Sequence, residues 1–264
     1  MAEIRGVLLD LSGVLYVGDQ EIPGAVAAVE RLRGAGLPLR CLTNTTRSTR
    51  DRVHAKLASL GFAIGTHEIF TAPRAALAHV ERERLRPLLL IHPDLEPEFS
   101  GIDREDPNAV VLGDAGEGFG YAALNRAFRL LMEGAPLIAM GDNRYFRESD
   151  GLSLDVGPFV AALEYAAGVE AVVVGKPSRA FFHGAVEELG VSPEACVMVG
   201  DDALSDVEGA LAVGLGGVLV RTGKYRDGDE ARIQTPGAVI VDDIVAAVEW
   251  ILGQVRGSAF RRAT

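Results

Sequence analysis

The sequence predicts an α/β protein built on a doubly wound parallel sheet, with a second α/β domain inserted into it. Short apolar runs alternate with helical patterns along the whole chain. The runs are apolar nearly throughout, which is typical of strands that helices cover on both faces. A length of 264 residues and an apolar fraction of 48% suit one large domain or two modest ones.

The beginning of the chain sets this pattern. Residues 4–11 predict a buried strand, and residues 23–35 predict a helix with proline at its first position. A strand over residues 37–43 and a helix over residues 48–60 follow, and Gly61 ends that helix.

The last third of the chain repeats this order of elements. Strands are predicted at residues 171–175, 196–200, 217–220 and 239–241, and helices at residues 178–189, 204–213 and 244–252. Ligands of parallel α/β sheets bind beyond the carboxyl ends of the strands. Polar residues directly after a strand are therefore the candidates for chemistry.

The middle of the chain contains longer connections. Its predicted strands are residues 88–91, 110–112 and 137–140. We expect residues 73–169 to form an inserted α/β domain, and residues 1–72 and 170–256 to form the core. Residues 257–264 are expected to be a flexible tail.

The net charge of −11 argues against nucleic acid or an anionic membrane as a partner. A site for an anion in so acidic a protein would need a metal ion or local cations. Cys41 and Cys196 both lie in apolar runs, which favours buried, reduced thiols. No segment approaches the roughly 18 apolar residues of a membrane span, so a cytoplasmic protein is expected.

Four predicted strand ends carry polar residues. They are Asp10, then Thr43 with Asn44, then Lys176, and finally Asp201 with Asp202 and, one helical turn later, Asp206. Each of them alone reads more simply as a turn residue or a helix cap. Their joint occurrence at strand ends favours a functional site.

This set of residue types suits phosphoryl transfer. A carboxylate such as Asp10 can attack phosphorus and form an aspartyl-phosphate. Mg²⁺ prefers oxygen ligands and keeps several waters, so Asp10, Asp201 and a backbone carbonyl suffice to bind it. Thr43, Asn44 and Lys176 can then donate to the phosphoryl oxygens.

The same residues, in the same order, resemble the four motifs of the haloacid dehalogenase superfamily, beginning with Asp10-Leu-Ser-Gly-Val-Leu-Tyr16. Thr43 and Lys176 are 133 positions apart, which resembles the branch with a large α/β cap domain inserted at this point. The stretches that start at Asp155 and Arg221 are similar to a subgroup acting on phosphohistidine, phospholysine and pyrophosphate.

The resemblance implies a Rossmann-like core and a Mg²⁺-dependent phosphatase of small phosphorylated molecules or phosphoramidates. It also implies a homodimer. The metal ligands it implies are Asp10, the backbone carbonyl of Ser12, Asp201 and Asp206. We expect the substrate-binding residues to be Ser12, Thr43, Asn44 and Lys176. We further expect residues 73–169 to act as a mobile lid.

Ser12 departs from the pattern of most of the superfamily, in which a second aspartate serves as general acid and base. A serine hydroxyl is a poor acid, so substrates with good leaving groups should be favoured, such as P–N bonds, pyrophosphate and aryl phosphates. Serine at this position also allows a second hypothesis, a phosphoryl-accepting binding or signalling module with little turnover.

A third hypothesis is an oxidoreductase that binds a dinucleotide. The stretch Gly214-Leu-Gly-Gly217 is a weak candidate for its glycine fingerprint, because it precedes a strand instead of joining a strand to a helix. This hypothesis is the least favoured of the three.

Overall fold

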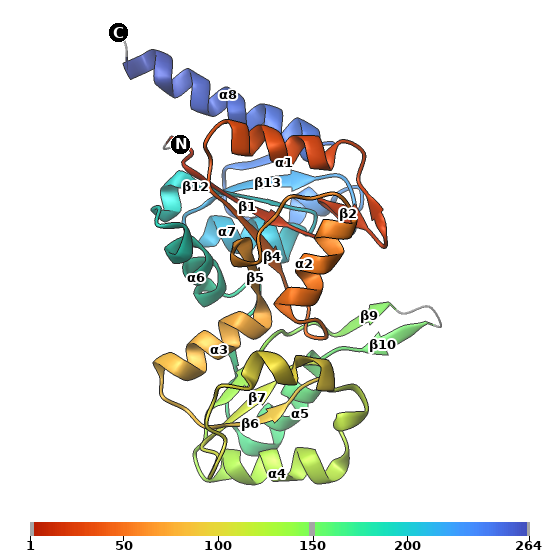
Figure 1. Cartoon of the computed structure of the whole chain (residues 1–264). Coiled ribbons are helices and arrows are strands. Elements are labelled where there is room, and N and C mark those ends of the chain that lie inside the picture. The colour runs from red at the N-terminus through yellow and green to blue at the C-terminus, as the bar shows by residue number, and fades with distance from the viewer. Residues whose placement is uncertain (1–2, 148–150, 263–264) are drawn as a thin grey trace. The chain divides into compact units, whose positions relative to one another are not determined.

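The computed structural model describes residues 3–147 and 151–262. Contacts between Cα atoms divide the chain into two compact units (Figure 1). The first consists of Met1–Thr43, Val53–Phe70 and Lys176–Thr264, and the second of Asn44–Arg52 and Thr71–Gly175.

A six-stranded sheet forms the centre of the first unit. Its order is β14-β13-β12-β1-β4-β5. The bounds are β1 Gly6–Asp10, β4 Leu39–Thr43, β5 Ile69–Thr71, β12 Cys196–Gly200, β13 Gly216–Val220 and β14 Ala238–Val241. β1 pairs in parallel with both β12 and β4, which confirms the expected parallel core. The chain builds the sheet outward from β1, first on one side and later on the other, so the topological switch point lies between β1 and β12.

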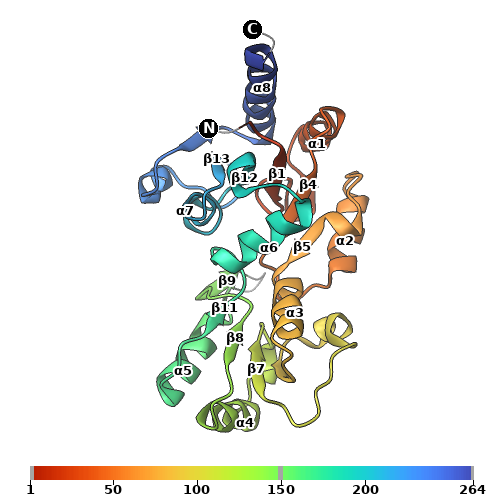
Figure 2. The ribbon, with the colours of Figure 1, turned by 90° about the vertical axis from the view of Figure 1, so that its left-hand side faces the viewer.

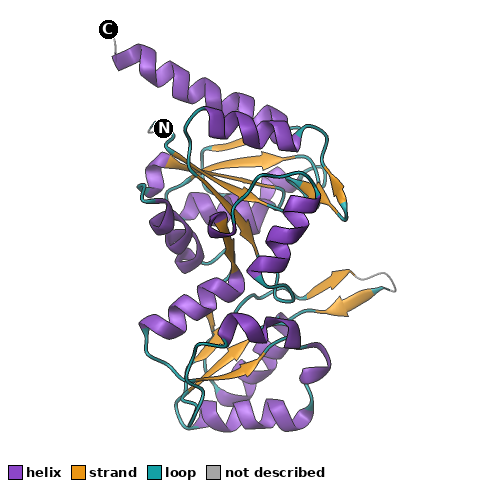
Figure 3. Ribbon diagram, viewed as in Figure 1, coloured by secondary structure: helices purple, strands orange, loops and turns teal. Residues whose placement is uncertain are grey.

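Helices cover both faces of this sheet (Figure 3). On one face lie α1 (Ala25–Gly34) and α8 (Ile244–Arg262), side by side, with the apolar part of α2 (Arg50–Ser59). On the other face lie α6 (Arg179–Leu189), the π-helical turn η5 (Ala203–Glu208) and α7 (Gly209–Ala212) (Figure 2). This coverage explains why the strands are apolar throughout.

Several predicted helix boundaries were wrong. Pro23 precedes the N-cap Gly24, whose φ of +82° favours glycine, so α1 does not begin with proline. The helix expected over residues 204–213 is split into η5 and α7. The expected flexible tail is helical through Arg262, since no proline interrupts α8, and residues 263–264 lie outside the described part of the chain.

Two short features of the first unit were not predicted. They are the three-residue strand β5 and the hairpin of β2 (Tyr16–Val17) with β3 (Gln20–Glu21). Runs of two or three residues are too short to show an apolar periodicity.

The second unit contains a parallel four-stranded sheet in the order β11-β8-β7-β6 (Figure 2). Its strands are β6 Pro87–Leu90, β7 Ala109–Leu112, β8 Leu137–Ala139 and β11 Val172–Val173. Its helices are α3 Ala72–Arg82, α4 Tyr121–Met132 and α5 Gly157–Ala167, and it also holds the helical turns of η2 Pro93–Phe99 and the hairpin of β9 Tyr145–Arg147 with β10 Leu152–Leu154.

Strand β11 corrects one sequence-based assignment. It was expected in the core sheet, yet Val172 pairs with Ile138 of β8 in the second unit. An apolar run indicates a buried strand but not the sheet that the strand joins. Lys176 therefore does not follow a strand of the core sheet.

Residues 44–52, which the sequence placed in the core, are grouped with the second unit. Arg47 is paired with Asp114, and the backbone N–H of Arg50 donates to Glu98. These contacts tie the segment to the loops that follow β6 and β7. Residues 3–147 and 151–262 contain no helix that combines the length and the apolarity that a bilayer crossing requires.

Candidate active site

Asp10 is the last residue of β1, at the carboxyl edge of the core sheet and beside the switch point. Its side chain is buried. The strand register places Asp10 opposite Leu42 of β4, so Thr43 ends the neighbouring strand at the same edge.

Asp201 and Asp206 come from the next strand on the other side of β1. β12 ends at Gly200, Asp201 follows directly, and Asp206 lies in η5. Both residues are only 1% exposed. A Cβ atom on Gly200 would lie 2.2 Å from the Cβ of Asp206, so glycine is needed for this close approach.

Asp202, the neighbour of Asp201, has a different role. Its Oδ1 accepts hydrogen bonds from the backbone N–H groups of Leu204 and Ser205, at 3.0 and 2.9 Å. It is therefore the N-cap of η5. The alternative that an aspartate after this strand caps the following helix is therefore correct for Asp202 but not for Asp201.

Lys176 reaches the carboxylates from the segment between β11 and α6. Its Nζ contacts Oδ1 of Asp10 and lies 2.7 Å from Oδ1 of Asp206. Burial alone would lower the pKa of Lys176, but the charges of Asp10 and Asp206 outweigh it and raise that pKa above its usual value. The lysine is therefore a fixed cation.

Asp10, Asp201 and Asp206 each contribute one carboxylate oxygen to a group whose members all lie within 4.8 Å of one another. Burial and the charges of the other two carboxylates raise the pKa of Asp201 to about 7. Burial also raises the pKa of Asp206, to about 6, against the opposing charge of Lys176. The cluster contains three carboxyl groups and one ammonium group, so it has excess negative charge once the carboxyl groups are ionised.

These residues fit a hard divalent cation such as Mg²⁺. The donor set is all oxygen, as Mg²⁺ prefers. Within the described part of the chain, Oδ1 of Asp201 is buried and has no hydrogen-bond partner. A cation at this position would both satisfy that oxygen and offset the excess charge.

The remaining candidate residues occupy simpler positions. The side chain of Ser12 is exposed, in the turn that joins Asp10 to β2. Thr43 is half-buried at the end of β4. Asn44 follows it and belongs to the second unit, where its Oδ1 lies close to Gly175.

Two hydrogen bonds near Asp201 could not be predicted from the sequence. The backbone N–H of Lys224 donates to Oδ2 of Asp201 at 2.6 Å, and the hydroxyl of Thr222 donates to the carbonyl of Gly13. The stretch Arg221-Thr-Gly-Lys-Tyr resembles a motif of the subgroup, but its residue types do not indicate what it does. A hydrogen bond donated by a backbone N–H cannot be predicted from residue types, because nearly every residue type has this group.

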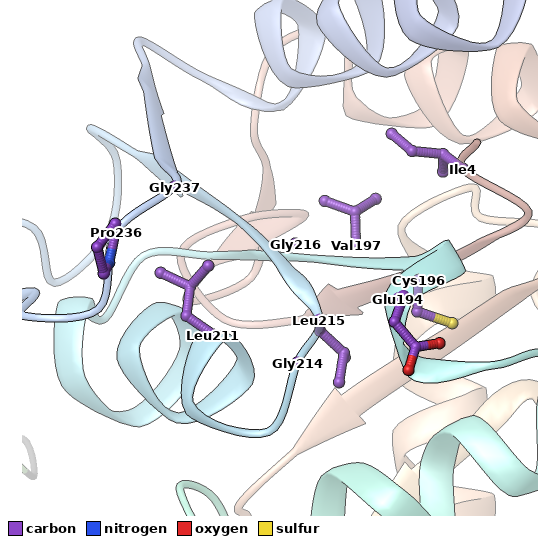
Figure 4. A pocket seen from close by; sticks show the side chains of 10 residues that line it. All are labelled: Ile4, Glu194, Cys196, Val197, Leu211, Gly214, Leu215, Gly216, Pro236 and Gly237. Atoms are coloured by element: carbon purple, nitrogen blue, oxygen red, sulfur yellow. The ribbon is translucent and has the colours of Figure 1, made fainter. Parts of the chain in front are cut away.

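The first unit has a pocket at the amino edge of the sheet, opposite the edge at which Asp10 lies (Figure 4). Its volume is about 200 Å³, and its lining includes Cys196 and Gly216, which begin β12 and β13. Glu194 is the only charged residue of the ten that line it. Burial raises the pKa of the Cys196 thiol to about 12, so this thiol is not a nucleophile at neutral pH.

The second unit has a pocket of its own, of about 640 Å³. It is lined by residues that follow β6 and β7, among them His92 and Asp114, and by Phe119 and Phe159, which stack with their ring centroids 3.7 Å apart. It therefore lies at the carboxyl edge of that sheet, where α/β proteins bind ligands.

Comparison with known families and proteins gave consistent matches. Residues 7–104 match a family described as haloacid dehalogenase-like hydrolase, and residues 173–247 match one described as HAD-hydrolase-like. The chain is 48% identical over 249 residues to haloacid dehalogenase-like hydrolase domain-containing protein 2 of Homo sapiens, covering 94% of this chain and 96% of that protein.

Two further similar proteins have names that state a phosphatase activity. Phospholysine phosphohistidine inorganic pyrophosphate phosphatase of Xenopus laevis is 48% identical over 257 residues, covering 94% of this chain and 95% of that one. A crystal structure of glycerol phosphate phosphatase from Mycobacterium tuberculosis, in complex with magnesium, has a TM-score of 0.81 and 29% identity, covering 92% of this chain and 76% of that one.

Proposed function

Because this chain belongs to the haloacid dehalogenase-like hydrolases, we propose that it is a Mg²⁺-dependent phosphatase that acts through an aspartyl-phosphate on Asp10. The observation that carries the proposal is the buried cluster of Asp10, Asp201 and Asp206, in which Lys176 contacts the first and the last of these. The magnesium complex of the mycobacterial phosphatase supports the choice of metal.

In the proposed first step, a carboxylate oxygen of Asp10 attacks the phosphorus of the substrate. The bond from phosphorus to the leaving group breaks, and the leaving group keeps the electron pair of that bond. A leaving group that needs a proton takes it from solvent. In the second step, water attacks the phosphorus, the bond to Asp10 breaks, and inorganic phosphate leaves. Asp10 returns to its original state, which permits many turnovers.

The other side chains orient the reactants and offset charge. Asp10, Asp201, Asp206 and the backbone carbonyl of Ser12 would hold Mg²⁺. When bound, the ion supplies positive charge to the phosphoryl oxygens. Lys176 already contacts Oδ1 of Asp10, which places its ammonium beside the attacking group.

Thr43 and Asn44 complete the proposed phosphoryl site as hydrogen-bond donors. Thr43 ends β4, the strand next to the one that Asp10 ends. Asn44 follows it directly. Their hydroxyl and amide groups can donate to the equatorial oxygens, on which charge accumulates in the transition state.

Ser12 narrows the substrate class. A phosphatase without a carboxylic acid at this position should favour leaving groups that depart without a delivered proton. Phosphoramidates, pyrophosphate and aryl phosphates meet this condition. The substrates in the name of the Xenopus laevis relative belong to the same class.

Release of phosphate over many turnovers tests this proposal. Purified protein should release phosphate from p-nitrophenyl phosphate, pyrophosphate and phosphoimidazole with Mg²⁺, and EDTA should stop the release. A single equivalent of phosphoryl group retained by the protein, without further release, would instead support the phosphoryl-accepting module.

The raised pKa values of Asp201 and Asp206 predict that Mg²⁺ binds more weakly as the pH falls. An aspartate in an unfolded chain titrates near 3.9, well below about 7 and about 6 in the fold. Between those pH values the metal-free fold retains protons that the unfolded chain has lost, so its stability falls as the pH rises from 4 through 7. Mg²⁺ must displace those protons and should restore stability most at high pH.

Thermal unfolding with and without Mg²⁺ at pH 5.5 and pH 8 measures this effect. The rise in Tm caused by Mg²⁺ should be clearly larger at pH 8. In Asp201→Asn, which removes one of the titrating carboxylates, the rise should be small at both pH values. An equal rise at both pH values in the unaltered protein would contradict the assignment of these carboxylates as ligands.

A further inference from the structure

The two carboxylate oxygens of Asp201 have different surroundings. Oδ2 accepts the hydrogen bond of 2.6 Å from the backbone N–H of Lys224. Oδ1 is buried without a hydrogen-bond partner among the described residues. One oxygen is thus held by the backbone, and the rotation of the carboxylate is fixed while the other oxygen remains available to a cation.

The backbone donor lies in the turn after β13, and two glycines bring this turn close to Asp201. Gly223 has a φ of +63°, and a Cβ there would lie 2.1 Å from Oδ2 of Asp201 and 2.4 Å from the Cα of Gly13. Gly13 has a φ of +98°, and a Cβ there would lie 1.9 Å from the same oxygen. Neither position has room for a side chain, and both backbone conformations favour glycine.

Thr222 joins this turn to the turn that follows Asp10. Its hydroxyl donates to the carbonyl oxygen of Gly13. The N–H of Gly13, the residue after Ser12, in turn donates to the carbonyl of Tyr16 at 2.7 Å, and the N–H of Leu15 donates to the carbonyl of Leu11 at 2.9 Å, which closes the turn that contains Ser12. One hydroxyl therefore connects the turn carrying the proposed backbone ligand Ser12 to the turn that holds Asp201.

We infer that residues 222–224 form a positioning clamp that orients the carboxylate of Asp201 toward Mg²⁺, and that Thr222 is the side chain that fixes this clamp. The inference rests on the proposed function and extends it to residues that touch neither substrate nor metal. Loss of partners that orient metal ligands typically weakens metal binding by about 10- to 100-fold.

Titration calorimetry of Mg²⁺ into the metal-free protein, with no substrate, tests the clamp. Thr222→Val removes the hydroxyl and keeps the shape of the side chain, and we expect its Kd for Mg²⁺ to rise by about tenfold. Thr222→Ser keeps the hydroxyl and should bind Mg²⁺ nearly as the unaltered protein does. Thr222→Ala also removes the hydroxyl and does not put a methyl group in its place. It replaces the valine variant in this measurement if that variant does not fold.

The Tm of each metal-free variant separates positioning from simple stability. A variant without the hydroxyl that has a lower Tm but an unchanged Kd would overturn the inference. Equal weakening in Thr222→Ser and Thr222→Val would also overturn it, because the hydroxyl would not be the determinant. If the unaltered protein binds Mg²⁺ and the variants behave as expected, but no phosphate is released, the proposed function fails and the clamp stands. Absence of Mg²⁺ binding in the unaltered protein would overturn both.

Discussion

Replacing Asp10 with asparagine is expected to lower kcat for phosphate release by more than 100-fold, which corresponds to a barrier higher by more than about 2.7 kcal/mol. An amide oxygen is a poor nucleophile and cannot form an acyl-phosphate by simple attack. The substitution is nearly isosteric, and the amide oxygen can still accept from Lys176, which contacts Oδ1 of Asp10. The fold should therefore survive while the covalent step is lost.

Asp202→Asn is the matched control. Asp202 lies beside Asp201 but caps η5, and asparagine is as good an N-cap as aspartate. This variant should keep both its Tm and most of its activity. The activity of Asp10→Asn is measured at saturating Mg²⁺, once its Tm has been shown to equal that of the unaltered protein. An activity above about one hundredth of the unaltered value would show that Asp10 is not the nucleophile.

Replacing Ser12 with aspartate is expected to raise the rate on an alkyl phosphate by about 10²- to 10⁴-fold, the usual effect of general acid catalysis. The exposed side chain of Ser12 leaves space for the added carboxyl group. An alkoxide leaving group needs a proton, whereas phosphate has a second pKa of about 6 and imidazole is protonated near 6.5. The rate on a phosphoramidate should therefore change far less.

Ser12→Asn provides the control, because it adds similar bulk without an acid and should help neither substrate. Rates of glycerol phosphate and phosphoimidazole hydrolysis by the three proteins decide the question. No gain on the alkyl ester would mean that another residue or a water already supplies the proton. Equal gains on both substrates would mean that the added carboxyl group does not act by protonating the leaving group. The proposed preference for good leaving groups would then fail.

Much of the core could be predicted because its strands are buried on both faces and carry an uninterrupted apolar signal. The rule that chemistry follows strand ends pointed to Asp10 and Asp201, which the structure does bring together. Lys176 was predicted as a site residue because it follows an apolar run that was expected to be a strand of the core sheet. That reason was wrong, since the strand belongs to the sheet of the second unit. Its contact with Asp10 comes from the segment that leads into α6.

The clamp could not be predicted, for two physical reasons. Thr222 and Gly13 are 209 positions apart, and no periodicity relates them. The donor to Asp201 is a backbone N–H, which every residue except proline possesses. A glycine at position 223 reads as an ordinary turn residue until the carboxylate beside it is known.

The central claim is that a phosphoryl group is carried by Asp10, and acid quenching during turnover tests it most directly. Protein mixed with Mg²⁺ and ³²P-labelled substrate should carry label within one turnover, and hydroxylamine should release that label, as it does from acyl-phosphates. Borohydride reduction followed by peptide mass spectrometry should find the modified residue at position 10, and Asp10→Asn should carry no label. Label on a different side chain, or rapid turnover in which no label ever reaches the protein, would contradict the covalent mechanism.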